Sequence, residues 1–201
     1  MRTRKIRIYP TQEQKNILNE WFDAFDSMYN ATTVYIRNFM YVNGEIDQNF
    51  SKSLLNWKLF RSGLKSERDF LASKMKHPMP AHILDEAIKK STANHKTCFE
   101  LYKQKKNEKF HVRKWKKTKR NRMIAIEKGY FKNNTFCPRT FDFFKSSEDF
   151  SKIDRAVILQ YSRDTKKYLL LVPEKIPMFP SETSLRSATN VARSDLSLKM
   201  I

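Results

Sequence analysis

The chain has 201 residues, enough for one medium-sized domain or two small ones, and 40% of them are apolar, which excludes a disordered chain. Its three glycines are too far apart for a Walker loop or a dinucleotide fingerprint, and its two cysteines exclude a disulfide scaffold and an all-cysteine zinc site. Forty Lys and Arg against 21 Asp and Glu leave a formal net charge of +19. A surface so basic attracts polyanions, first nucleic acid and second acidic membranes.

The first segment, residues 2–9, alternates between isoleucines and charged or aromatic residues. Lys5, Arg7 and Tyr9 fall on one side, so the spacing predicts a half-buried strand with a basic outer face. Pro10 ends this strand. Residues 11–14 (TQEQ) then have the form of a capping box, the side-chain signature that begins a helix.

Apolar residues at helical spacing follow in four places. They predict a first helix from 11 to 39 and a helix over 81–102, which has acids near its start and lysines near its end, as the helix dipole favours. Two shorter helices are predicted over 51–60 and 66–75, the second opened by Ser66. A turn centred on Asn43-Gly44 separates the first long helix from the short ones.

After residue 102 the pattern changes to short segments rich in β-branched and aromatic residues. They predict strands at 123–126, 130–131, 156–161 and 168–172, the last two joined by a hairpin loop over 162–167. Prolines then introduce a tail rich in Ser, Thr and Arg without a regular apolar pattern.

The positive charge is concentrated in one fifth of the chain. Residues 101–140 carry 14 basic and 2 acidic side chains, a net charge of +12. Because like charges at neighbouring positions repel, we interpret this block as a nucleic-acid interface rather than as a solvated face. The candidate contacts are Lys103, Lys105, Lys106, Lys109, Arg113, Lys114, Trp115, Lys116, Lys117, Lys119, Arg120 and Arg122.

Two roles are open for Trp115, which lies in the middle of this block. It could stack on a base, as aromatic side chains do in single-strand complexes, or it could anchor the basic block to the core. The four histidines are spread along the chain, and His95 falls on the apolar side of its helix. We therefore expect no metal site, no cofactor and no catalytic residue.

The first 40 residues resemble a known family. The stretch RKIRIYPTQEQKNILNEWFDAFDSMYNATTVYIRNF has a basic strand, a YPT-x-EQ motif and the pair Tyr29-Asn30. It is similar to the N-terminus of the transposon-encoded OrfB/TnpB proteins and their eukaryotic relatives, the Fanzors. The order of elements continues to match at 80–102, 110–128 and 157–173, so that the resemblance covers about residues 2–175.

The resemblance implies RNA-guided DNA recognition. In that family a wedge-like β domain and an inserted helical domain hold guide RNA and a short DNA motif, and a RuvC-like nuclease domain with a zinc ribbon follows. Early wedge strands lie close to nucleic acid, which adds Lys5, Arg7 and Tyr9 to the candidate contacts. The family's first catalytic aspartate motif does not follow Pro173, so we expect a truncated or frameshifted member without the nuclease.

The sequence thus predicts an α+β fold: a small β-barrel-like wedge domain from 1–10 and 103–175, a helix-turn-helix-like helical insert at 11–102, and an irregular tail at 176–201. The chain is expected to bind structured guide-type RNA and duplex DNA without cutting, and not to be an enzyme. No apolar run is long enough for a membrane span, so we expect no membrane partner and a soluble intracellular protein, in the cytoplasm or the nucleus depending on the host.

Two alternatives stay open. A sequence-specific DNA-binding regulator would use the predicted helices 11–39 and 51–60 as a helix-turn-helix, although the second offers only Lys52 and Lys58 for contacts with DNA. The chain could instead be the binding half of a nuclease that a separately encoded RuvC-like domain completes in trans.

Overall fold

The structure is a computed structural model that describes residues 2–42, 45–46, 50–106, 110–116 and 121–174. Two compact units divide the chain, and one of them comprises Arg4–Val172. The described residues of the other unit are 2–3 and 173–174, the outer ends of two strands. All of the described helices lie in the unit Arg4–Val172.

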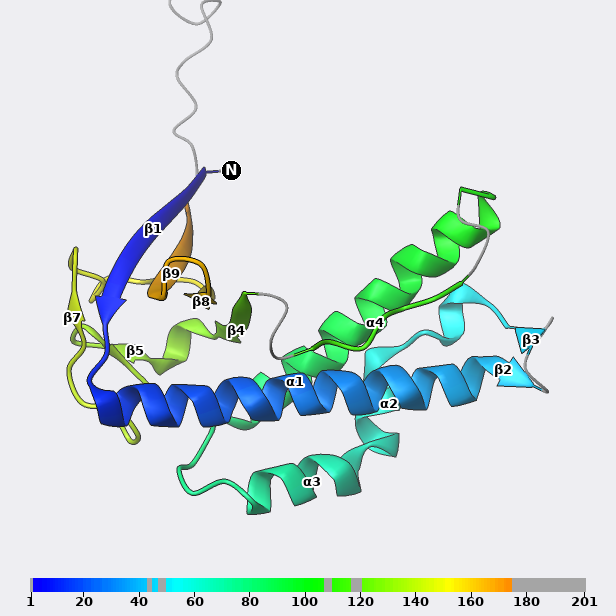
Figure 1. Cartoon of the computed structure of the whole chain (residues 1–201), viewed down its shortest axis with the longest axis horizontal. Helices are drawn as coiled ribbons and strands as arrows, with labels where there is room; N and C mark the ends of the chain where they lie inside the picture. Colours follow the sequence, from blue (N-terminus) through cyan, green and yellow to red (C-terminus); the bar gives the residue numbers. More distant parts are fainter. Residues whose placement is uncertain (1, 43–44, 47–49, 107–109, 117–120, 175–201) are drawn as a thin grey trace, which may run out of the picture. The chain divides into compact units, whose positions relative to one another are not determined.

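Five strands form the main sheet, in the order β4-β8-β9-β1-β7 (Figure 1). Strand β8 is antiparallel to both β4 and β9, and β7 is antiparallel to β1. Among the described strands the sheet is open, because β4 and β7 form its two edges and do not pair with each other. The expected barrel-like closure therefore needs correction, since a barrel requires its edge strands to pair. The strands are β1 (Arg2–Tyr9), β4 (Arg122–Ile126), β7 (Lys145–Ser146), β8 (Val157–Ser162) and β9 (Lys167–Glu174).

Two short hairpins complete the strands. Strands β2 (Tyr41–Val42) and β3 (Glu45–Ile46) flank the predicted turn, whose centre at 43–44 lies outside the described residues. Strands β5 (Phe131–Lys132) and β6 (Thr135–Phe136) are joined by Asn133-Asn134, both with positive φ of 48° and 56°. Asparagine tolerates this left-handed backbone better than most residues, which explains the tight turn.

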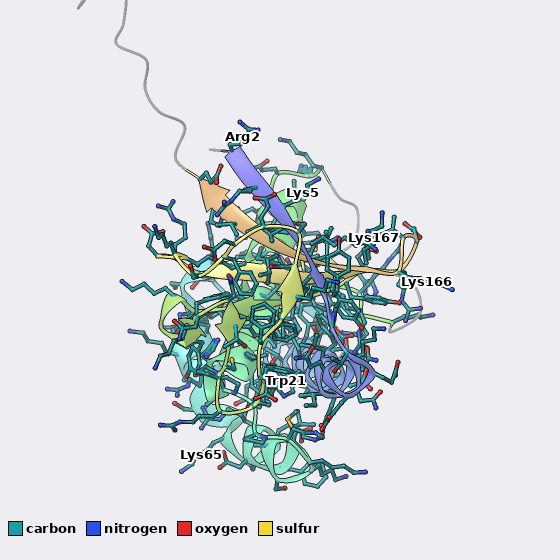
Figure 2. The ribbon with its side chains drawn as sticks, turned by 90° about the vertical axis from the view of Figure 1, so that its left-hand side faces the viewer. Arg2, Lys5, Trp21, Lys65, Lys166 and Lys167 are labelled. Atoms are coloured by element: carbon teal, nitrogen blue, oxygen red, sulfur yellow. The ribbon has the colours of Figure 1, made fainter. Side chains whose placement is uncertain are left out.

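The predicted alternation of β1 is confirmed. Ile6 and Ile8 are buried, whereas Lys5 and Tyr9 are exposed on the other side of the strand. Figure 2 labels Lys5 on β1. The same alternation in β4, β8 and β9 gives the sheet one buried face, made of Ile124, Ile126, Val157, Leu159, Leu170 and Val172. The predicted hairpin between β8 and β9 is also present, with Ser162 opposite Lys167.

A long helix, α1 (Gln12–Met40), follows β1 and packs mainly against α4 (Ala81–Lys103) (Figure 1). The predicted capping box begins it: Gln14 N donates to Thr11 Oγ1 over 3.2 Å, and Thr11 N donates to Gln14 Oε1 over 3.0 Å. Its predicted apolar side is buried, with Trp21 fully enclosed in the core (Figure 2). Helices and strand β4 pack around α1, so polar residues such as Asp26 are buried as well.

The shorter helices differ from the prediction. In place of one helix over 51–60, a 3-10 turn (Lys52–Leu54) precedes α2 (Trp57–Gly63), because Asn56 caps a new helix: Lys58 N donates to Asn56 Oδ1 over 3.0 Å. Helix α3 (Lys65–Ser73) has no Ser66 cap, since the chain passes from α2 to α3 through Leu64 alone. A second 3-10 turn, Lys128–Tyr130, precedes β5 where a strand was expected to begin at residue 130.

A buried polar group lies between α1 and α4. The hydroxyls of Thr33 and Ser91 are 3.0 Å apart, and His95 Nδ1 lies 2.8 Å from the Ser91 carbonyl oxygen, so that this nitrogen is the donor. Burial lowers the pKa of His95, which favours the neutral ring. His95 is thus a core residue, in agreement with its place on the apolar side of the helix.

Strand β4 contacts both α1 and α4, so the sheet and the helices share a core. The expected division into a wedge domain (1–10 and 103–175) and a helical insert (11–102) stays a prediction, as does the tail at 176–201, which lies outside the described residues.

Lowering the pH from 7 to 5 is expected to lower the free energy of unfolding partly through His95. Because its folded-state pKa is depressed, the unfolded state binds the proton first. This contribution is complete above the unfolded pKa of about 6.5 and is lost as the pH falls below it. Urea unfolding at both pH values measures the effect. His95→Gln should show a shallower pH dependence than the control His111→Gln at an exposed position, and equal slopes would contradict the assignment.

Candidate nucleic-acid interface

The described residues 110–116, here called the basic segment, run back along α1 and α4 after the end of α4 (Figure 1). The side chain of Asn30 on α1 holds this segment by two hydrogen bonds. Asn30 Nδ2 donates to the Trp115 carbonyl oxygen over 3.0 Å, and Trp115 N donates to Asn30 Oδ1 over 2.7 Å. One amide side chain therefore satisfies both backbone groups of Trp115.

The indole of Trp115 packs on the same helix. It stacks on Tyr29 with ring centres 3.7 Å apart and planes 10° apart, and Phe25 lies 6.0 Å away at 24°. The Tyr29 hydroxyl accepts a hydrogen bond from Asn94 of α4 over 2.8 Å, which joins both helices to this contact. These contacts agree with the anchoring role for Trp115, and stacking on a base stays a prediction.

The start of the basic segment is also buried. Phe110 and Val112 are 7% and 8% exposed, and the Tyr41 hydroxyl donates to the Phe110 carbonyl oxygen over 3.1 Å. The charged members of the segment, Arg113, Lys114 and Lys116, face solvent. The apolar residues thus attach the segment, and the basic side chains remain available to a partner.

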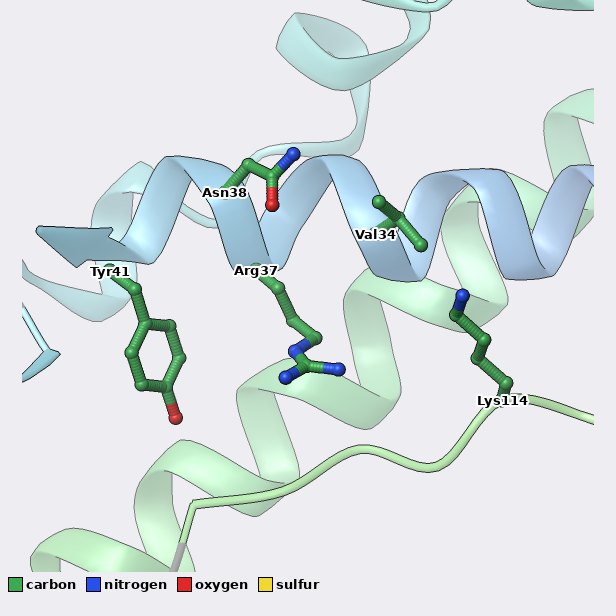
Figure 3. Close-up of a pocket in the computed structure, with 5 residues that line it drawn as sticks. All are labelled: Val34, Arg37, Asn38, Tyr41 and Lys114. Atoms are coloured by element: carbon green, nitrogen blue, oxygen red, sulfur yellow. The ribbon is translucent and has the colours of Figure 1, made fainter. Parts of the chain in front are cut away.

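One further cation, Arg37 in the last turn of α1, faces the segment. Figure 3 shows Arg37 extending from α1, Tyr41 extending from β2 and Lys114 extending toward α1, around a hollow that Val34 and Asn38 also line. The sequence patterns did not single out Arg37. The available signal was a basic residue near the end of a helix, which usually complements the helix dipole.

The other basic residues of the predicted set fall in three places. Lys103 lies in the last turn of α4, with its ammonium 5.3 Å from the centre of the Phe99 ring. Lys105 and Lys106 follow the helix and are exposed. Lys109, Lys117, Lys119 and Arg120 lie outside the described residues.

The outer face of β1 is a separate candidate surface. Lys5 is exposed, and the Arg7 guanidinium lies 4.8 Å from the centre of the Tyr9 ring, which is 42% exposed. Arg7 is fixed through its backbone, because its N donates to Ser147 Oγ over 3.0 Å and its carbonyl oxygen accepts from Ser147 N over 2.8 Å. Its contacts with Ser147 and within the strand involve no residue of the basic segment.

Arg122 does not fit the predicted nucleic-acid interface, because it is 6% exposed and points into the protein. Its guanidinium pairs with Asp23 through Nη2 and lies 3.4 Å from Asp26 Oδ2 through Nε. It also lies 5.1 Å from the centre of the Phe22 ring. This arginine pairs with the partly exposed Asp23 and the buried Asp26 and connects β4 to α1, so we leave it out of the proposed interface.

Among the described residues, no three His, Cys, Asp or Glu side chains are grouped so that they could hold a metal ion. Burial raises the pKa of the Cys137 thiol to about 12, which keeps this side chain protonated. None of the helices in the described ranges combines the length and the apolar character that crossing a bilayer requires.

Comparisons with known proteins give a match to one family model and to three similar proteins. A family model for the helix-turn-helix domain of OrfB proteins matches residues 1–32, which here form β1 and most of α1. The TnpB-like proteins L770 and R854 of Acanthamoeba polyphaga mimivirus are each 42% identical over 177 residues, or 87% of this chain and 34% of theirs. The TnpB-like protein L79 of the same virus is 40% identical over the same length. The chain thus spans about a third of the length of these relatives.

The helix-turn-helix match supports a nucleic-acid-binding protein, and the relatives are of a transposon-associated kind. The likeness to the TnpB-like proteins extends over most of the chain, well beyond the matched domain. These matches support an OrfB/TnpB family member, in agreement with the resemblance seen in its first 40 residues.

Asn30→Ala is expected to release the basic segment, because it removes both hydrogen bonds to Trp115. The loss should cost about 1–3 kcal/mol and should abolish hydrogen-exchange protection at the Trp115 amide. Asn38→Ala, at an exposed position on the same helix, is the control. Equal protection of the Trp115 amide in the two variants would show that Asn30 does not hold the segment.

Arg122→Met is expected to lower the free energy of unfolding by about 3–5 kcal/mol, because it leaves the Asp26 carboxylate buried without its cation. Adding Asp26→Asn should recover part of this loss, since the amide carries no charge. Urea denaturation of the two variants measures both effects. A stability equal to that of the unchanged chain in Arg122→Met would contradict the structural role.

Proposed function

We propose that this chain binds nucleic acid through the basic segment and the outer face of β1, holding guide-type RNA together with duplex DNA, and that it does not cut either. The observation that carries the proposal is the attachment of the basic segment by Asn30 and Trp115, with its charged side chains in solvent. A segment whose backbone is held in this way loses less conformational entropy on binding than a free segment would.

Charge supports a polyanionic partner. The block 101–140 carries a net charge of +12, and among its described residues Arg122 is paired with Asp23 and Asp26 of α1. Lysines and arginines that neutralise phosphates release condensed counterions, so affinity falls steeply with salt. The family membership favours RNA and DNA over other polyanions, and it is the basis for the guide-type RNA in the proposal.

The proposal also covers the correspondence between this fold and the domains of the family. We infer that the sheet and the helices correspond to the family's wedge-like and inserted helical domains, respectively. The proposed contacts are Lys5, Arg7 and Tyr9 on β1, Lys103, Lys105 and Lys106 after α4, and Arg113, Lys114, Trp115 and Lys116 in the basic segment. Lys109, Lys117, Lys119 and Arg120 remain proposed contacts on the strength of the sequence alone.

The salt dependence of binding tests the proposal. If about eight phosphates are neutralised, the slope of log affinity against log salt should be on the order of −6 to −7, and a slope shallower than about −2 would contradict it. The triple variant Lys105→Gln, Lys106→Gln, Lys116→Gln should make the slope shallower by about 2–3. The control triple Lys58→Gln, Lys65→Gln, Lys90→Gln removes the same charge from exposed positions on the helices and should change it much less.

The helix-turn-helix match also supports a second candidate function, that of a sequence-specific DNA-binding regulator without RNA. That function would use residues 11–39 and 51–60 as a helix-turn-helix, so replacing Lys52 and Lys58 by glutamine would abolish discrimination between DNA sequences. Sequencing of the nucleic acid that stays bound after a wash in about 0.5 M salt decides between the two. A single short RNA supports the proposal, whereas DNA of one sequence without RNA supports the regulator.

A further inference from the structure

Two cations from distant parts of the sequence face the same space between α1 and the basic segment. Arg37 and Lys114 line a hollow of about 610 Å³ together with Val34, Asn38 and Tyr41 (Figure 3). The same two cations also line an adjoining hollow of about 590 Å³, whose other walls are residues of the basic segment. The two hollows therefore meet at this pair of charges.

Neither cation has a carboxylate partner in the ion pairs of the described residues. Other arginines of the helices and the sheet do: Arg61 and Arg68 both pair with Asp85, and Arg122 pairs with Asp23 and Asp26. The described walls of both hollows also contain no acidic residue. The described residues therefore do not compensate the positive charge at this place.

The walls favour an anion in other respects. Tyr41 is neutral, because burial raises the pKa of its phenol and its hydroxyl donates to the Phe110 carbonyl oxygen. The position of Lys114 is fixed by its neighbour Trp115, which Asn30 and Tyr29 hold on α1. Two like charges kept near each other by the fold repel, and a shared anion removes this repulsion.

We propose that Arg37 and Lys114 together bind one phosphodiester group of the nucleic-acid strand that the basic segment contacts. A guanidinium can donate two parallel hydrogen bonds to phosphate oxygens, and the lysine ammonium adds a point charge from the opposite wall. This inference rests on the proposed function, and it assigns to α1 a contact outside the basic block. It also gives the binding surface a second wall, so that the strand lies between the helix and the segment.

The test measures binding of the full chain to a fluorescent single-stranded RNA and to a DNA of the same sequence, each over a range of salt concentrations. Arg37→Gln and Lys114→Gln should each weaken binding about threefold to tenfold and reduce the salt slope by about 0.7–1. The double variant should lose less than the product of the two single losses, because both side chains contact one phosphate. Arg37→Lys should keep most of the slope, since it keeps the charge.

Arg139→Gln and Lys65→Gln are matched controls at exposed positions away from both hollows. Losses no larger than those of the controls, or strictly multiplicative losses, would overturn the shared phosphate site while leaving the proposed function intact. A loss confined to RNA would overturn it as well, because a backbone phosphate is common to both probes. If the unchanged chain binds neither probe with a steep salt dependence, the proposed function itself fails.

Discussion

The attachment of Trp115 to α1 is the contact on which the proposed interface depends. A run of basic residues repels itself, so a chain such as 110–116 has no electrostatic reason to lie against the protein. Asn30 satisfies both backbone groups of Trp115, and Tyr29 provides an aromatic surface for its indole. The apolar and hydrogen-bonding contacts of one residue thereby fix the positions of its charged neighbours.

A second contact connects the sheet to the same helix, and here the positive charge is buried and paired rather than exposed. Arg122 at the start of β4 is buried and neutralised by Asp23 and Asp26 of α1, whereas the cations of the basic segment are left exposed. The two links lie on either side of residues 117–120. The chain after α4 thus contacts helix α1 twice. The first contact is an aromatic stack with amide hydrogen bonds, and the second is an ion pair.

Helix α1 therefore connects the family resemblance to the proposed chemistry. The pair Tyr29-Asn30, which contributes to the resemblance, is the pair that holds Trp115. The matched helix-turn-helix region ends at residue 32, a little beyond this pair, and Arg37 follows in the last turns of the same helix. One helix provides the core of the fold, the anchor of the basic segment and one wall of the proposed phosphate site.

Local patterns in the sequence determined several elements correctly. The alternation of β1, the capping box at Thr11 and the apolar side of α1 follow from short-range periodicity and side-chain capping, which need no distant partner. The concentration of charge in 101–140 is likewise a property of the sequence alone. The family resemblance was visible for the same reason, since it lies in contiguous motifs.

Only the tertiary structure decided which charged and aromatic residues are exposed and which are buried. Arg122 and Lys114 carry the same charge and lie in the same block. Arg122 is nevertheless buried and paired with acids about a hundred residues earlier in the chain, whereas Lys114 is exposed. Arg37 became a candidate only because the segment returns to α1, and the open sheet reflects pairings between distant strands. Burial, ion pairing and sheet closure depend on contacts between residues far apart in sequence, which periodicity does not encode.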